Sequence, residues 1–126
     1  MSMAIRGIQE AQQANLRQVA AVKPNGALGE AVKVGTTLAH RYAVSITHVD
    51  SGSLRASQRL SVQGLRGRVY LDPNAVNPRS GARPSIYGNY EHARGGSHAF
   101  YERTVEEHGN SIGDAMVQTF IGGLPR

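Results

Sequence analysis

Apolar residues recur with helical spacing in three segments of the chain, and these segments predict three helices. The first helix, 3–22, has an apolar stripe between Gln-rich polar faces and ends at a Pro-Asn-Gly turn at 24–26. The stripe consists of Ile5, Ile8, Leu16 and Val19. The second helix, 27–43, keeps the clearest period, over two heptads. Gly35 lies within its stripe, which indicates a close approach by another backbone or a tolerated defect.

The closing helix is predicted over 99–121, with two glycines at 122 and 123 as its stop. We expect one stripe of it to be buried. This stripe consists of Tyr101, Val105, His108, Ile112, Ala115, Met116, Thr119 and Phe120. Gly109 and Gly113 are candidates to bend or interrupt the helix.

The middle of the chain follows a different pattern. Residues 44–49 alternate briefly and predict a short extended segment. A turn follows, formed by Asp50, Ser51, Gly52 and Ser53. Ser51 or Ser53 can cap the short helical turn expected over 54–59. Alternating apolar residues over 59–65 and 68–71 then predict two strands joined near 64–67.

An irregular segment, 72–86, contains three prolines and carries basic residues without an acid after Asp72. A loop of this length is usually functional or disordered, so we interpret it as a mobile arm that orders against a partner. A loop with no partner is the open alternative. Residues 86–92 form a short strand or helical turn. The expected fold is therefore a single α+β domain, 1–126. Two N-terminal helices and one long C-terminal helix pack on a small, mainly antiparallel sheet in this fold.

Charge adds a second level of organisation. The net charge is +5, and 12 of the 14 basic residues are Arg, the side chain suited to bidentate contacts with carboxylates and phosphates. Nine of the Arg lie within 41–103, whereas the chain beyond 103 is mainly acidic. A basic middle and an acidic C-terminal part could pair head-to-tail between copies. A solvated surface with no special use is the alternative.

Catalytic and cofactor-binding patterns find no support. Residues 109–113 match G-x-S-x-G, but amphipathic helix precedes Ser111 where a nucleophile elbow needs a strand. His48, Asp50 and Ser51 are too close in sequence to face one another as a triad. We therefore predict no enzyme activity, no catalytic residue and no cofactor.

Metal and membrane binding are not predicted either. His92 and His98, with Glu91 and Glu102, match no metal-binding spacing, and the chain has no cysteine. No apolar run approaches the length of a membrane span. The N-terminus does not have the pattern of a signal peptide.

Four short stretches resemble one known family. Residues 49–57, Val-Asp-Ser-Gly-Ser-Leu-Arg-Ala-Ser, are similar to the V-x-T-G-x-L-x-x-S turn of the tail-completion, or head-to-tail joining, proteins of long-tailed bacteriophages. Residues 87–91, Tyr-Gly-Asn-Tyr-Glu, match a later Y-x-x-Y-x-E-type stretch of that family. A glycine pair at 95–96 and Ala-Phe-Tyr-Glu at 99–102 stand where the family has a glycine segment and its closing helix. Ser51 replaces the family's Thr, and the closing helix has no leading Pro.

The resemblance implies a small structural protomer that closes into a ring, commonly a hexamer and at times a dodecamer, at the head–tail junction of a virion. DNA passes through such a ring and contacts it non-specifically. The neighbours would be a connector or stopper protein on the head side and a tail-tube or tail-terminator protein on the tail side. The chain would reach the virion neck from the host cytoplasm, where assembly takes place. A small basic nucleic-acid-binding protein is the second hypothesis, because Arg-rich loops and a pI near 10 suit a polyanion.

Five arginines are the candidate interface or channel residues: Arg55, Arg59, Arg79, Arg83 and Arg94. We expect Arg55 and Arg59 to project one helical turn apart, where an acid of a neighbouring copy could meet them. Exposure to solvent alone is the alternative. We also expect the isolated chain to be monomeric or weakly associated, because no long apolar surface strip is visible in the sequence.

Overall fold

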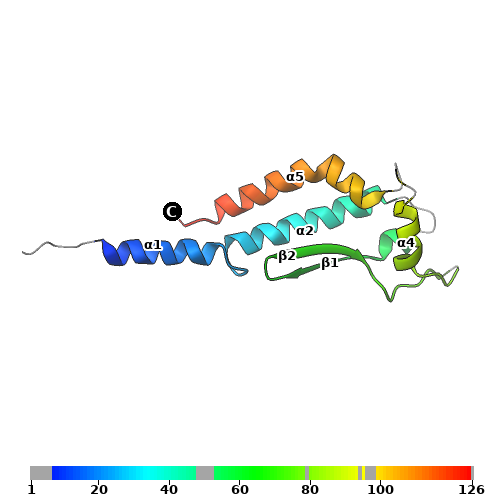
Figure 1. The fold of residues 1–126 in the computed structure, drawn as a ribbon, viewed down its shortest axis with the longest axis horizontal. Coiled ribbons are helices and arrows are strands. Elements are labelled where there is room, and N and C mark those ends of the chain that lie inside the picture. The colour runs from blue at the N-terminus through cyan, green and yellow to red at the C-terminus, as the bar shows by residue number, and fades with distance from the viewer. Residues whose placement is uncertain (1–6, 48–52, 79, 94, 96–98, 126) are drawn as a thin grey trace, which may run out of the picture.

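A computed structural model describes residues 7–47, 53–78, 80–93, 95 and 99–125 of the chain (Figure 1). These residues form five helices and one two-stranded antiparallel sheet, so the predicted α+β class is confirmed. The helices are α1 (Ile8–Ala21), α2 (Ala27–Ile46), α3 (Ser53–Ala56), α4 (Pro84–Ala93) and α5 (Phe100–Gly122), and the strands are β1 (Gln58–Gln63) and β2 (Arg66–Leu71).

Helix α2 is the centre of the fold, with α5 on one side of it and the β1–β2 hairpin on the other (Figure 1). The small residues of α2 allow this double packing, since Ala31, Gly35 and Ala43 are buried. Met116 of α5 packs onto Gly35, where any added Cβ would overlap it. The close approach predicted at Gly35 is therefore made by a side chain of the neighbouring helix rather than by its backbone.

The contact between α2 and α5 also uses aromatic rings. His108 of α5 stacks on Tyr42 of α2, with ring centroids 3.9 Å apart and planes nearly parallel. Helix α5 is continuous through Gly109 and Gly113, so neither glycine interrupts it. The predicted buried stripe is confirmed only in part. Seven of its eight residues are half-buried and Val105 is 71% exposed, while the buried residues of the helix are Phe100 and Thr104. Val105 faces an open groove instead of α2.

The hairpin has a tight two-residue turn at Gly64 and Leu65. Gly64 has φ of 60°, which a type II′ turn requires at its first central residue and which glycine adopts without strain. The strands pair from Gln58 opposite Leu71 to Gln63 opposite Arg66. The predicted strands at 59–65 and 68–71 are confirmed in kind, with ends shifted by one or two residues.

The extended segment predicted at 44–49 is wrong for its described part, because Val44 to Ile46 continue α2. The Thr47 amide donates to the Ala43 carbonyl oxygen at 2.9 Å, and the Thr47 hydroxyl donates to the same oxygen. Adding residues to an existing helix costs little, whereas alternation over two apolar positions is a weak strand signal. The rest of this segment lies outside the described residues.

The irregular segment is shorter than predicted, since α4 begins at Pro84 and runs for ten residues. Proline suits the first turn of a helix because its missing amide hydrogen would have no partner there. Within the described part of the loop, the Asn77 amide donates to the Ala82 carbonyl at 2.7 Å, and the Gly81 amide donates back to Asn77 at 2.8 Å. The loop therefore closes on itself in a local turn.

Candidate assembly surfaces

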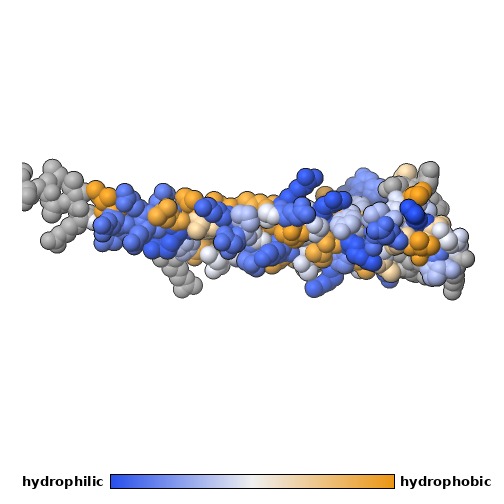
Figure 2. Space-filling model, turned by 90° about the horizontal axis from the view of Figure 1, so that it is seen from below, coloured by the Kyte–Doolittle hydropathy of each residue, from blue (hydrophilic) through white to orange (hydrophobic). Residues whose placement is uncertain are grey.

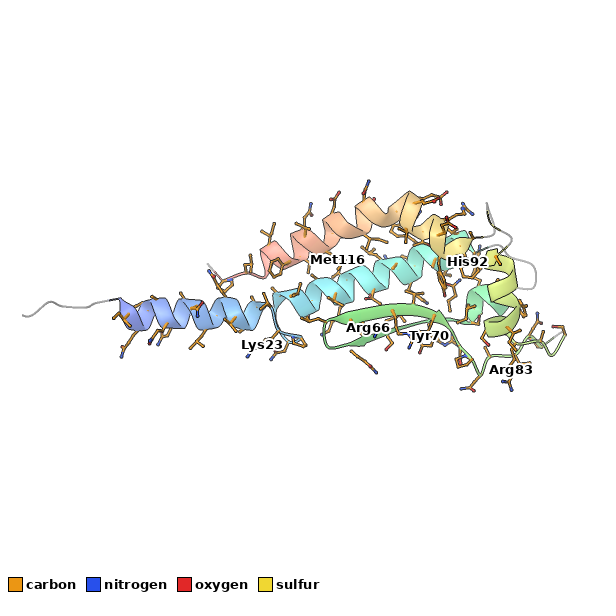
Figure 3. The ribbon with its side chains drawn as sticks, in the orientation of Figure 1. Lys23, Arg66, Tyr70, Arg83, His92 and Met116 are labelled. Carbon is orange, nitrogen blue, oxygen red and sulfur yellow. The ribbon has the colours of Figure 1, made fainter. Side chains whose placement is uncertain are left out.

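The outer face of the hairpin is basic. The register places Arg59 opposite Tyr70, Ser61 opposite Arg68 and Gln63 opposite Arg66, so these six side chains share one face. The other face is apolar and lies against α2, where a Cβ on Gly67 would overlap the Thr36 side chain. Figure 3 shows Arg66 and Tyr70 on the side of the hairpin away from α2.

The three arginines of this face are exposed, and no acidic residue lies within 58–71. The Arg68 guanidinium is 4.5 Å from the centre of the Tyr70 ring, a cation–π contact that leaves its N–H groups available. Three arginines and no acids give the hairpin a formal charge of +3. We name this surface the arginine face; it consists of Arg59, Ser61, Gln63, Arg66, Arg68 and Tyr70.

Helix α5 carries the opposite charge on the other side of α2. Its acids are Glu102, Glu106, Glu107 and Asp114, all of them exposed, and its one basic residue is Arg103. Four acids and one arginine give α5 a formal charge of −3. Arg103 lies 3.2 Å from Glu107 in an ion pair, so Glu102, Glu106 and Asp114 dominate the outer surface of the helix. The charge asymmetry of the sequence thus becomes two separate faces of the molecule (Figure 1).

Arg55, a predicted interface residue, is used inside the chain. Its Nη2 donates to the Thr47 carbonyl oxygen at 3.0 Å and to the Ser45 carbonyl oxygen at 3.4 Å. Both carbonyls belong to the C-terminal end of α2, where a cation is favourable. Gln58 Nε2 donates to the hydroxyl of Thr47 in the same cluster. Arg55 therefore attaches α3 to the end of α2, and Gln58 attaches the start of the sheet to the same place.

Arg59 does not stand one helical turn beyond Arg55, so that part of the prediction is wrong. Helix α3 ends at Ala56, and Arg59 lies in strand β1. Its Nη2 is 3.5 Å from a carboxylate oxygen of Asp72, and its Nη1 donates to the Ala56 carbonyl at 2.6 Å. A strand begins here because residues 58–63 alternate between the two faces of the hairpin.

The other predicted residues are only partly described. Arg83 is exposed directly before α4, at the end of the molecule farthest from α1 (Figure 3). Ser53 begins α3. Arg79, Arg94, Asp50, Ser51 and Gly52 lie outside the described residues, so their predicted roles stay predictions.

Sequence reasoning missed Arg66 and Arg68, which the hairpin register brings together with Arg59. The signal was present as Arg66-x-Arg68-x-Tyr70, the spacing of one face of a strand. It could be used only once the position of the turn was known, because a shift of one residue moves every side chain to the other face.

A groove of about 520 Å³ opens between the hairpin and α5, with α2 as its floor. The floor runs from Val32 to Ala43. Leu65 and Val69 form the hairpin wall, and the α5 wall includes Val105 and Ile112. The lining is mainly aliphatic, and we name this feature the apolar groove. The Tyr101 ring lines it as well, and burial raises the pKa of the Tyr101 hydroxyl to about 12.

Helix α1 presents an uncovered apolar stripe. Ile8, Leu16 and Val19 are 47%, 64% and 42% exposed, and Ala21 is the one buried residue of this helix. Figure 1 shows α1 projecting beyond the rest of the fold, and Figure 2 shows its apolar residues on the surface. The polar residues Gln12 and Asn15 lie on the same side between Ile8 and Leu16, so the stripe is interrupted, and the expected monomeric or weakly associated state stays a prediction.

The weighed catalytic and metal patterns do not form sites in the described structure. Residues 109–113 lie in the middle of α5 with helix on both sides, so Ser111 has no strand before it. His92 Nε2 accepts a hydrogen bond from the Glu102 amide at 3.3 Å, and its ring meets Phe100 edge-on. Within the described residues, no cluster of three His, Asp or Glu side chains could hold a metal ion.

None of the described helices combines the length and apolar character needed to cross a membrane. In comparisons with known proteins, the chain matches no protein-family model, no curated protein and no solved structure.

Proposed function

We propose that the chain is a structural protomer that assembles with copies of itself into a ring at the head–tail junction of a tailed bacteriophage. The observation that carries the proposal is the separation of charge across α2, with the +3 hairpin on one side and the −3 helix α5 on the other. The resemblance of 49–57 and 87–91 to tail-completion proteins supplies the location.

Opposite faces of opposite charge favour a head-to-tail contact. The arginine face of one copy meets the outer surface of α5 on the next, and the joined pair still presents one free face of each kind. A contact of this kind is heterologous, so it gives a ring when the rotation between copies closes. We propose six copies, with twelve as the alternative, and a central hole through which DNA passes.

In the virion, such a ring would lie between a connector or stopper protein on the head side and a tail-tube or tail-terminator protein on the tail side. Genes for a portal, a capsid protein and a tail-tube protein beside the gene for this chain would support this placement. A gene neighbourhood of unrelated metabolic enzymes would count against it.

The charge contact can be tested with two reversed variants. The first carries Arg66→Glu and Arg68→Glu, and the second carries Glu102→Lys and Glu106→Lys. All four side chains are exposed, so the changes should leave the monomer folded. Each variant has two like-charged faces and should self-associate at least tenfold more weakly than the native chain in analytical ultracentrifugation.

A mixture of the two variants restores complementary faces, because each copy then finds a neighbour of opposite charge on both sides. We expect the mixture to recover association, and added salt to weaken both this association and that of the native chain. Variants that associate as well as the native chain, or a mixture that stays monomeric, would contradict the proposed contact.

A nucleic-acid-binding protein is the second candidate, and the arginine face is the observation that favours it. A two-stranded ribbon fits the major groove of B-DNA, and arginines along one face could contact phosphates. Three such contacts give a slope of about −2.7 in log K against log salt concentration. Fluorescence anisotropy with duplex DNA would measure this slope. Tight DNA binding that the Arg66→Glu, Arg68→Glu variant loses, without association of the native chain, would favour this candidate.

A further inference from the structure

Two apolar surfaces of this chain are uncovered, and they have complementary shapes. The α1 stripe is convex and stands away from the fold, whereas the apolar groove is concave and lies between α5 and the hairpin. Large side chains exposed along one face of a helix are the usual sign of a docking surface. The question is which molecule covers them.

The chain cannot easily cover its own groove with its own α1. The connection between α1 and α2 is tight, because the Lys23 amide donates to Ala20 at 3.2 Å and the Gly26 amide donates to Lys23 at 2.9 Å. Two glycines permit this approach: a Cβ on Gly26 would overlap the Ala20 carbonyl oxygen, and a Cβ on Gly29 would overlap that of Pro24. The joint holds α1 roughly in line with α2 and directed away from the groove (Figure 1).

The two surfaces have the same length. The α1 stripe from Ile8 to Val19 and the groove floor from Val32 to Ala43 each comprise 12 residues of helix, with 11 helical rises from end to end. At 1.5 Å per residue, each is about 16 Å long. Val32 and Ala39 are the half-buried residues of the floor, since Met116 covers Gly35 and Ala43 is buried. Together with the aliphatic walls they suit the apolar side of a helix.

We propose that α1 of one copy lies in the apolar groove of a neighbouring copy, with its Ile8, Leu16 and Val19 side chains against the groove. This inference adds a second contact to the proposed ring, and it rests on the proposed function because the ring brings the neighbouring copy into place. A second copy is the occupant because groove and stripe occur on one chain with matching length and character. The polar side of α1 carries only Glu10 and Arg17 as charged residues, so it offers no charge pattern that would select a different partner.

The contact between α1 and the groove is too small to hold two copies together alone, but it can strengthen the ring. The contact rests on the three large exposed side chains of α1, so it is small. A stable interface usually buries about 800 Å² on each partner. The arm contact is therefore weak alone, and it strengthens the ring because the charge contact already holds the two copies together.

The chain has no cysteine, so engineered disulfides test this arrangement cleanly. One chain carries a cysteine at one end of the α1 stripe, either Ile8→Cys or Val19→Cys, so that both directions of α1 in the groove are tested. A second chain with a larger tag carries Val105→Cys on the groove wall. All three side chains are exposed in the single copy. After mixing and mild oxidation, we expect a disulfide between the two chains, seen on a non-reducing gel as a band of their summed size.

Two controls carry the same chemistry on the wrong surface. Arg17→Cys lies on the opposite side of α1 from Val19, and Val117→Cys lies on α5 outside the groove, with its side chain 55% exposed. Arg17→Cys in place of Val19→Cys, or Val117→Cys in place of Val105→Cys, should lower the yield of the mixed disulfide at least tenfold. Circular dichroism of each variant confirms that the chains remain folded.

Equal yields from the paired positions and the controls would overturn the inference, and so would folded variants that give no mixed disulfide. Arg68 also lines the groove, so the variant that separates this outcome from the charge experiment is Glu102→Lys, Glu106→Lys, whose two positions lie outside the groove. Selective cross-linking together with a failed charge reversal would support the arm contact and count against the proposed head-to-tail face. Restored association without selective cross-linking would support the ring and overturn the arm contact.

Discussion

Replacing Arg55 by alanine tests whether this side chain stabilises the fold or is available to bind a neighbouring copy. The side chain makes one charge-assisted hydrogen bond of 3.0 Å and one of 3.4 Å to carbonyls at the end of α2. A net contribution of about 1.5 to 3 kcal/mol is usual for a bond to a charged group, and a cation at a helix C-terminus adds about 0.3 to 1 kcal/mol.

Two effects set the expected loss. Arg55→Ala leaves the carbonyl of Thr47, a fully buried residue, without its side-chain donor. Against this, the Arg55 Nε is buried and has no partner among the described residues, so the native arrangement already carries a desolvation cost. We expect a net loss of about 2 kcal/mol in the free energy of unfolding. For a chain of 126 residues, this lowers the melting temperature by about 7 °C.

Arg59→Ala is the matched control, four residues along the chain. Arg59 also donates to the carbonyl oxygens of Ala56 at 2.6 Å and Gln58 at 3.0 Å, but its side chain is about half exposed, so water can replace these partners as well as Asp72. We therefore expect a loss of about 0 to 1 kcal/mol in the free energy of unfolding for this variant. Urea unfolding of both variants, followed by circular dichroism on the monomer in dilute solution, gives the comparison. Equal losses in the free energy of unfolding for the two variants, or a loss below about 0.5 kcal/mol for Arg55→Ala, would refute the structural role of Arg55. Arg55 would then again be a candidate interface residue.

Two further predictions concern the joint and the groove. Gly29→Ala should lower the free energy of unfolding by about 2 kcal/mol, because the new Cβ overlaps the Pro24 carbonyl. Gly113→Ala has open space around it and should raise the free energy of unfolding by up to about 1 kcal/mol. Equal effects of the two variants in urea unfolding would contradict the tight joint. Burial raises the pKa of Tyr101 from 10.0 to about 12, so the fold favours the protonated hydroxyl. The stability due to this preference is complete below pH 10 and is lost as the pH rises toward 12. Between pH 10 and 12, the melting temperature of Tyr101→Phe should fall less than that of the native chain. Equal falls in melting temperature would argue against the burial of the Tyr101 hydroxyl.

The three long helices and the fold class were predictable from the sequence, because long periodic segments are strong signals, whereas the ten-residue helix α4 was not. The closing helix, predicted over 99–121, is observed as Phe100–Gly122. Its period persists over more than five turns, and glycines follow it. The second helix was also located correctly at its start, Ala27, and its end was missed by three residues because two alternating apolar positions favoured a strand.

The surfaces were harder to predict, because they depend on which side chains the fold brings together. Arg55 and Arg59 were selected as neighbours in the sequence, yet one lies against the end of α2 and the other is on the hairpin. The arginine face depends on the hairpin register, which the position of Gly64 decides. The stripe of α1 was visible in the sequence, but periodicity does not indicate whether a stripe is covered by the same chain.

The proposed function places the gene for this chain in the genome of a tailed phage, so electron microscopy of the particles from that genome, with the chain labelled by a C-terminal tag, is the most direct test. We expect a closed ring of tagged subunits at the head–tail junction, with the hairpin of each copy against α5 of the next. Particles in which the tag is absent from the neck, or in which tagged subunits make no contact with one another, would contradict the proposed function.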